Sequence, residues 1–261
     1  MAQRTLFGWL RLVILLTILL VVALNAWFDR ALTTDWDLPL RVTIYPIATG
    51  DENVAAYASR LEADDFAAID AFFVGQAASH GIGIEEPVRI RVSHAARSAP
   101  PARARDAGLI STVLWSLRTR YWAWRVAAHD SLPTPDIQIF AIYQRGDAHR
   151  PLPDSVGLTK GLYAIANLYA EPGAAGANDI VIAHELLHTL GATDKYDLAT
   201  GWPRVPDGLG EPRRTPLFPQ QYGEIMAGRI ALSATEAAMA DDLDSMLVGS
   251  LTAHEIGWSA K

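Results

Sequence analysis

Hydrophobic residues follow two kinds of spacing along the chain, and each spacing predicts one kind of element. Alternation of apolar and polar positions, rich in β-branched side chains, predicts strands. The predicted strands are Leu38–Ile47, Val88–Val92, Ile137–Tyr143 and Gly161–Tyr169. Apolar residues recurring at helical intervals predict helices. The predicted helices are Asn53–Gly75, Leu109–Ala128 and a short last helix at Leu251–Trp258.

The helix predicted at 109–128 has an apolar stripe and a flank of tryptophan and arginine. The stripe consists of Ile110, Val113, Leu114, Leu117, Tyr121 and Trp124. We expect the stripe to pack across a sheet, which would leave the arginines of the helix in water. Trp115 and Trp122 lie on the flank among these arginines. The alternative is that this flank rests on a membrane surface.

An uncharged apolar segment, Leu12–Phe28, lies near the N-terminus. It reaches the short limit for spanning a bilayer, and Trp9 and Trp27 lie near its ends, where interfacial aromatic residues belong. Arg4 and Arg11 precede it, so the positive-inside rule predicts a single-pass membrane protein with a cytoplasmic N-terminus. The rest of the chain would be exported, to the periplasm or the extracellular space in a bacterium. A cleaved signal peptide is the alternative and predicts the same export.

These predictions divide the chain into a stub and membrane anchor over residues 1–30 and one exported α+β domain over residues 31–261.

The composition of the chain excludes several functions. The chain has no cysteine, which excludes disulfides, thiolate metal ligands and cysteine nucleophiles. Its formal net charge of −7, without basic runs, argues against nucleic-acid binding.

The stretch 182–194, IAHELLHTLGATD, carries the candidate chemistry. His184 and His188 are four residues apart, so on a helix both imidazoles project from one face and can reach one metal ion. Glu185 lies beside that face, where it can accept a proton from a metal-bound water. Asn178 or Asp179 is expected to cap this helix.

The spacing continues beyond the second histidine. Gly191 can adopt the left-handed conformation that ends a helix, after which the chain turns back. The whole pattern, H-E-x-x-H-x-x-G-x-x-D, resembles the metzincin metallopeptidases, and in particular the snapalysin-type minority that has aspartate in place of a third histidine. The resemblance implies that Asp194 is the third ligand of one catalytic Zn²⁺ ion.

The resemblance implies several further features. They are a twisted mixed sheet with an active-site helix and a C-terminal helix, and a methionine beneath the metal, for which Met226 is the candidate. The strand before the active-site helix would border the cleft, so Tyr163, Ile165 and Asn167 are candidate substrate-binding residues. The implied activity is hydrolysis of peptide bonds in a polypeptide substrate, by a zinc-bound water that Glu185 activates.

Two other hypotheses stay open. In a gluzincin-type peptidase a downstream glutamate is the third ligand, and Glu211 and Glu224 are available. An exported, non-catalytic binding module would use the metal only structurally. Asp197 could be a spare ligand or an acceptor for an imidazole N–H. Control of activity by an unidentified protein partner is also left open.

Overall fold

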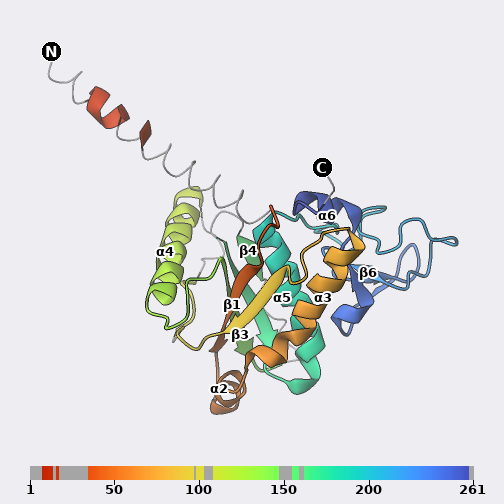
Figure 1. The fold of residues 1–261 in the computed structure, drawn as a ribbon, viewed down its shortest axis with the longest axis horizontal. Coiled ribbons are helices and arrows are strands. Elements are labelled where there is room, and N and C mark those ends of the chain that lie inside the picture. Colours follow the sequence, from red (N-terminus) through yellow and green to blue (C-terminus); the bar gives the residue numbers. More distant parts are fainter. Residues whose placement is uncertain are drawn as a thin grey trace.

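The computed structural model describes residues 8–13, 16–17, 35–96, 98–102, 108–146, 155–158 and 162–258. Its centre is a five-stranded sheet with the strand order β2-β1-β3-β5-β4 (Figure 1). The parallel strands are β1 (Leu40–Ala48), β2 (Val88–Val92), β3 (Ile137–Gln144) and β5 (Tyr163–Tyr169). The predicted strands are therefore confirmed within two residues at each end. The edge strand β4 (Val156–Leu158) pairs antiparallel with β5 and was not predicted.

Alternation along the strands sorts their side chains into two cores. On β5, Ala164, Ala166 and Leu168 belong to a large core shared with the helices on one face of the sheet. Tyr163 and Ile165 belong to a smaller core on the opposite face. The protein is thus a mixed α+β structure in which helices cover both faces of a mostly parallel sheet.

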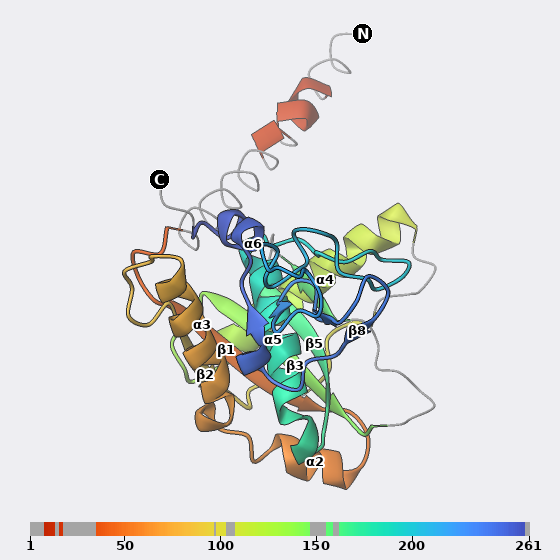
Figure 2. The ribbon, with the colours of Figure 1, turned by 90° about the vertical axis from the view of Figure 1, so that its right-hand side faces the viewer.

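Three helices cover the face with the large core (Figure 2). They are α2 (Glu52–Ala58), α3 (Ala67–Ser79), which follows a 3₁₀ turn at Ala63–Phe66, and α5 (Ala175–Leu190), which follows a 3₁₀ turn at Pro172–Ala174. The prediction of a single helix at 53–75 is wrong, because the helix is interrupted between α2 and the first 3₁₀ turn. There Asp65 accepts a hydrogen bond from the Glu62 N–H at 2.8 Å, which starts a new helical segment.

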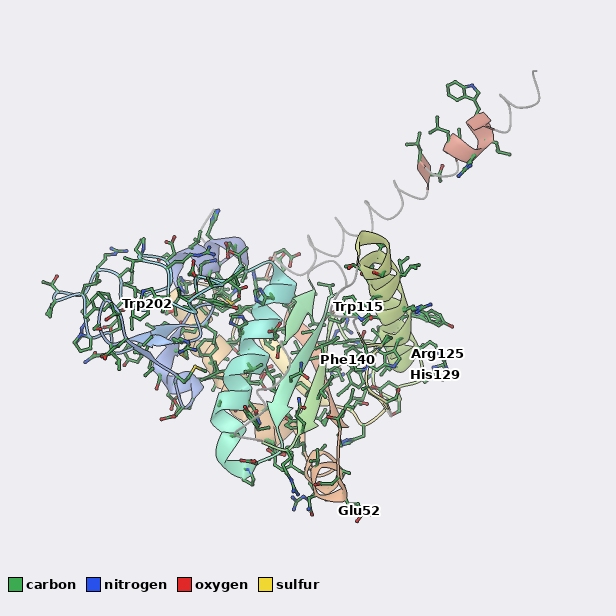
Figure 3. All side chains as sticks on the ribbon, turned by 180° about the vertical axis from the view of Figure 1, so that it is seen from behind. Glu52, Trp115, Arg125, His129, Phe140 and Trp202 are labelled. Carbon is green, nitrogen blue, oxygen red and sulfur yellow. The ribbon has the colours of Figure 1, made fainter. Side chains whose placement is uncertain are left out.

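The opposite face is covered by α4 (Leu109–Ala128), whose predicted bounds are confirmed. The prediction of which side of α4 packs on the sheet is wrong. The flank packs inward, with the Trp122 ring 4.3 Å from that of Phe140 on β3, and Trp115 also packs against the small core (Figure 3). The indole rings fill the space over the sheet, and the stripe residues from Val113 to Trp124 consequently face outward.

The C-terminal part lies on the same side of the sheet as α5 and contains short elements between loops (Figure 1). They are β6 (Gly223–Glu224) paired with β9 (Met246–Leu247), β7 (Ile230–Ala231) paired with β8 (Ala237–Ala238), a 3₁₀ turn at Leu243–Ser245, and α6 (Ser250–Glu255). The predicted last helix is confirmed in a shorter form. Trp258 is fully buried and its ring packs edge-on against that of Trp36 at 5.3 Å.

The predicted membrane anchor falls largely outside the described residues. Of the segment 12–28, only residues 12, 13, 16 and 17 are described, and they are helical. Across the described ranges, no helix combines the length and apolar character that a bilayer crossing requires.

Candidate metal centre

The helix α5 carries both histidines and ends at the predicted glycine. Gly191 has φ of 106°, and its N–H donates to the His188 carbonyl at 3.1 Å. This left-handed residue reverses the chain, as expected of a helix C-terminus. The reversal brings Asp194 back to the histidines: its Oδ1 lies 3.3 Å from Nε2 of His184 and 3.1 Å from Nε2 of His188.

Backbone carbonyls fix the orientation of both imidazoles. Nδ1 of His184 lies 2.9 Å from the Ile225 carbonyl oxygen, and Nδ1 of His188 lies 2.8 Å from the Ala192 carbonyl oxygen. A carbonyl oxygen can only accept, so both Nδ1 atoms carry a proton. In the neutral rings, Nε2 then presents a lone pair to Asp194. A metal-ligating histidine typically has this arrangement, with its other ring nitrogen donating to a carbonyl.

Three acceptors therefore converge on one point. His184, His188 and Asp194 each offer a ligand atom, and all three atoms lie within 4.8 Å of one another. Two neutral Nε2 atoms and a carboxylate oxygen repel one another unless a proton or a cation lies between them. In the described part of the chain, this is the one group of histidine and acidic side chains with the arrangement of a metal site. The donor set fits a zinc ion, which takes imidazole nitrogen and carboxylate oxygen.

Protonation of an imidazole at Nε2 would replace this repulsion by attraction to Asp194. Burial raises the pKa of Asp194, but hydrogen bonds with His184 and His188 outweigh it and hold that pKa below its ordinary value. Burial lowers the pKa of His188, while the hydrogen bonds with Asp194 and the Ala192 carbonyl raise it, and the net direction is upward. Both pKa directions show that a positive charge next to the Asp194 carboxylate is favoured.

Glu185 lies on the same turn of α5 and is only 5% exposed. Its Oε2 has no hydrogen-bond partner within the described residues. Burial raises the pKa of this carboxyl, the two neighbouring histidines lower it, and the net direction is upward. An unpaired buried carboxylate is costly, so the arrangement suits a group that exchanges a proton.

The edge strand β4 lies directly against this turn. The backbone of Gly157 lies close to the Glu185 carboxylate and lowers the pKa of that carboxyl slightly. A Cβ at Gly157 would lie 2.5 Å from Cβ of His188 and 2.6 Å from the Glu185 carbonyl oxygen. Only glycine lets the strand approach so closely.

A second network holds the loop that carries Asp194. Glu255 in α6 accepts from the N–H and the hydroxyl of Thr193, at 2.9 and 2.7 Å. It also accepts from Nζ of Lys195 at 2.7 Å, and the Lys195 side chain is only 3% exposed. Both neighbours of Asp194 in the chain are thereby attached to the last helix.

The turn that contains Met226 contacts both segments that carry the candidate ligands. Its preceding residue, Ile225, accepts from His184, and the Met226 carbonyl accepts from the Lys195 N–H at 2.9 Å. Met226 is fully buried. The turn ends at Gly228, which has φ of 66°. The backbone of Met226 and its neighbour Ile225 thus lies next to the two segments that bear the candidate ligands, while the role of Met226 beneath a metal stays a prediction.

Glu224 and Glu211, the downstream alternatives for a third ligand, are both engaged elsewhere. Glu224 is fully buried and accepts from the Thr252 hydroxyl at 2.6 Å and from the Ala227 and Gly249 N–H groups. Glu211 accepts from Arg214 and from the Gln221 N–H. Neither belongs to the histidine–aspartate group.

Two smaller predictions about α5 and its loop are wrong. The helix begins at Ala175, before both predicted caps, and the Asn178 side chain instead pairs with the N–H and carbonyl of Tyr169 at 3.0 and 2.9 Å. Asp197 accepts from Ala199 and Thr200 in its own exposed turn, whereas backbone carbonyls accept the imidazole N–H groups.

The candidate substrate-binding residues are not brought to the metal cluster. Tyr163 and Ile165 are buried under α4, on the opposite face of the sheet from α5. Asn167 follows them in the same alternation and is half-buried. Residues 163–165 of β5 are paired with β4, so β4 forms this edge of the sheet.

Sequence reasoning missed Gly157, Glu255 and the two carbonyl acceptors. A three-residue strand is too short for alternation to predict, and a carbonyl has no residue-type signal. Glu255 lies about 60 residues after the motif, so no local spacing indicated its contacts with Thr193 and Lys195.

Comparisons with known proteins add little to this description. No family model and no curated protein matches the chain. Two crystal structures of wild-type OgpA from Akkermansia muciniphila, in different crystal forms, are similar at 12% sequence identity with TM-scores of 0.40 and 0.39. Each comparison covers 85% of this chain and 62% of the OgpA chain. A likeness this weak carries no argument about fold or function.

Proposed function

We propose that this protein is a zinc-dependent endopeptidase with a metzincin-like site. The observation that carries the proposal is the convergence of two oriented imidazoles and one carboxylate beside the buried Glu185 carboxyl, whose Oε2 has no hydrogen-bond partner among the described residues. Three protein ligands leave a fourth position for water or substrate, as in catalytic rather than structural zinc sites.

Each residue has a separate task in this proposal. When bound, a zinc ion would supply a Lewis acid that polarises a peptide carbonyl and lowers the pKa of water. Glu185 would accept a proton at Oε2 from the attacking water and return it to the leaving amine. Its burial favours the protonated form, and a bound cation would oppose that effect. The backbone of Gly157 would hold the carboxylate in place.

The test separates metal binding from catalysis. Glu185→Gln is expected to keep the metal and to lower the rate of cleavage of an unfolded protein substrate by at least about a hundredfold. Glu52→Gln is the matched control, because Glu52 is an exposed glutamate in α2. Cleavage by Glu185→Gln at the wild-type rate would overturn the proposed role. Absence of metal-dependent cleavage by the wild type would favour a binding module with a structural metal.

We also propose that residues 12–28 anchor the domain to a membrane and that the domain acts outside the cytoplasm. The support is the uncharged apolar segment with arginines before it. Full-length protein is expected to remain in membranes after alkaline carbonate extraction, and deletion of residues 1–30 is expected to release it. Release of the full-length protein would contradict the anchor.

A further inference from the structure

The helix α4 exposes a row of large apolar side chains, which we call the outer face. Its residues are Val113, Leu114, Leu117, Tyr121 and Trp124, which are 52%, 50%, 58%, 60% and 62% exposed. They recur at helical spacing and so lie on one side of α4. The rings of Tyr121 and Trp124 stack at 5.8 Å and form its aromatic end. A contiguous apolar patch of this kind on a protein marks an interaction site.

The opposite side of α4 is held firmly, so the helix cannot rotate to hide the outer face. Thr119 is fully buried and Ala123 is 2% exposed. The Trp115 indole donates to the Pro101 carbonyl at 2.7 Å, and the Trp122 ring packs on Phe140. The outer face is therefore a permanent feature of the surface.

The charged side chains of α4 are all positive. Arg118, Arg120 and Arg125 are exposed, and residues 109–128 contain no aspartate or glutamate. The chain as a whole has a net charge of −7, so positive charge is concentrated here against the general trend. At 100° per residue these arginines lie on both flanks of the outer face.

We propose that α4 lies in the headgroup region of a membrane that contains anionic lipids, with its outer face toward the acyl chains. Leucine, tyrosine and tryptophan suit the apolar side of such an interface, and flanking arginines can reach the lipid phosphates. Each basic residue near an anionic surface adds to the attraction. A protein partner of opposite charge, or a second copy, would also explain the apolar row. A membrane agrees in addition with the anchor that we propose for residues 12–28, and the choice of a membrane rests on that proposal.

The geometry places the candidate metal cluster away from the membrane-facing helix. α4 covers one face of the sheet and α5 lies on the other, so the sheet separates the membrane-facing helix from His184 and His188 (Figure 2). Figure 3 shows α4 at the margin of the molecule with Arg125 on it, while Glu52 lies at a different end. The proposal is independent of the catalytic activity proposed above.

The absence of cysteine permits a direct test, because one introduced cysteine can be labelled uniquely. The full chain carries a nitroxide at Leu117→Cys in the outer face, or at Glu52→Cys as the control. It is reconstituted in phosphatidylcholine–phosphatidylglycerol vesicles, and collisions with oxygen and with a water-soluble nickel chelate are measured. The ratio of oxygen to nickel accessibility is expected to rise several-fold at position 117 and to stay at its aqueous value at position 52.

Three outcomes would overturn the proposal. The first is an aqueous ratio at position 117 in these vesicles. The second is dipolar coupling between labels at position 117, which would show that a second copy covers the outer face. The third is the same ratio at position 117 when Arg118, Arg120 and Arg125 are changed to Gln, or in vesicles of phosphatidylcholine alone. That result would show that anionic lipid does not contribute to the binding of α4. A lower ratio in both cases would support the proposed contribution of anionic lipid.

Discussion

Glu255 accepts two hydrogen bonds from Thr193, which lies 62 residues earlier and immediately precedes Asp194. The last helix thereby fixes the loop that carries Asp194, the candidate third ligand. The same carboxylate pairs with the buried ammonium of Lys195. Burial raises the pKa of Glu255, but these partners hold it below its ordinary value, so the carboxylate is charged at neutral pH.

Glu255→Gln should therefore weaken metal binding. The amide cannot accept from all three donors, so the loop loses part of its attachment while the ligands themselves are unchanged. Loss of a group that orients a ligand typically costs about tenfold in metal affinity. Competition with a chromogenic chelator measures this change. Glu236→Gln, at an exposed glutamate, serves as the control, and equal affinity of the two variants would show that Glu255 has no positioning role.

Gly157→Ala should disturb the turn of α5 that carries Glu185 and His188. The added methyl group would overlap backbone and Cβ atoms that cannot move independently. Overpacking of this kind costs about 1–3 kcal/mol, and the displaced carboxylate should lower the rate of cleavage. Gly83→Ala is the matched control, since a Cβ there meets nothing within 4 Å. Cleavage and thermal unfolding report the result, and wild-type values for Gly157→Ala would contradict the close approach of β4.

The raised pKa of Asp179 predicts that the stability of the protein depends on pH. Burial, helped by the charge of Asp65, raises its pKa from 3.8 to about 7. The folded protein therefore binds this proton more tightly than the unfolded chain. The resulting stabilisation is fully present below about pH 4 and is lost as the pH rises through about 7.

Asp179→Asn removes this dependence. The melting temperature of the variant minus that of the wild type should therefore be several degrees higher at pH 8 than at pH 5. The same exchange at exposed Asp64 is the control. A difference from wild type that is equal at both pH values would show that Asp179 is not the group responsible.

Spacing in the sequence predicted the parts of the site that lie within one helix and its exit. His184, Glu185 and His188 follow from helical geometry, and Gly191 adopts the expected left-handed turn. The proximity of Asp194 to both imidazoles came from the resemblance, and the geometry of the cluster agrees with it. What the sequence could not provide were contacts between distant segments, such as the Ile225 carbonyl on His184 or Glu255 on Thr193.

The error at α4 has a different physical origin. Periodicity identifies an apolar side of a helix but does not say which side is turned to the sheet. On α4 two sides are apolar, and the side with the large indole rings of Trp115 and Trp122 is the one that packs on the sheet. The other apolar side, the outer face, therefore remains exposed and is a candidate interaction site.

Metal content tests the central claim most directly. Purified protein should contain one equivalent of zinc per chain, measured by elemental analysis after dialysis against metal-free buffer. Glu185→Gln should retain it, whereas His184→Ala and Asp194→Ala should lose most of it. A wild-type protein without stoichiometric metal, or an Asp194→Ala variant that keeps the wild-type amount, would contradict the assignment of His184, His188 and Asp194 as the ligand set.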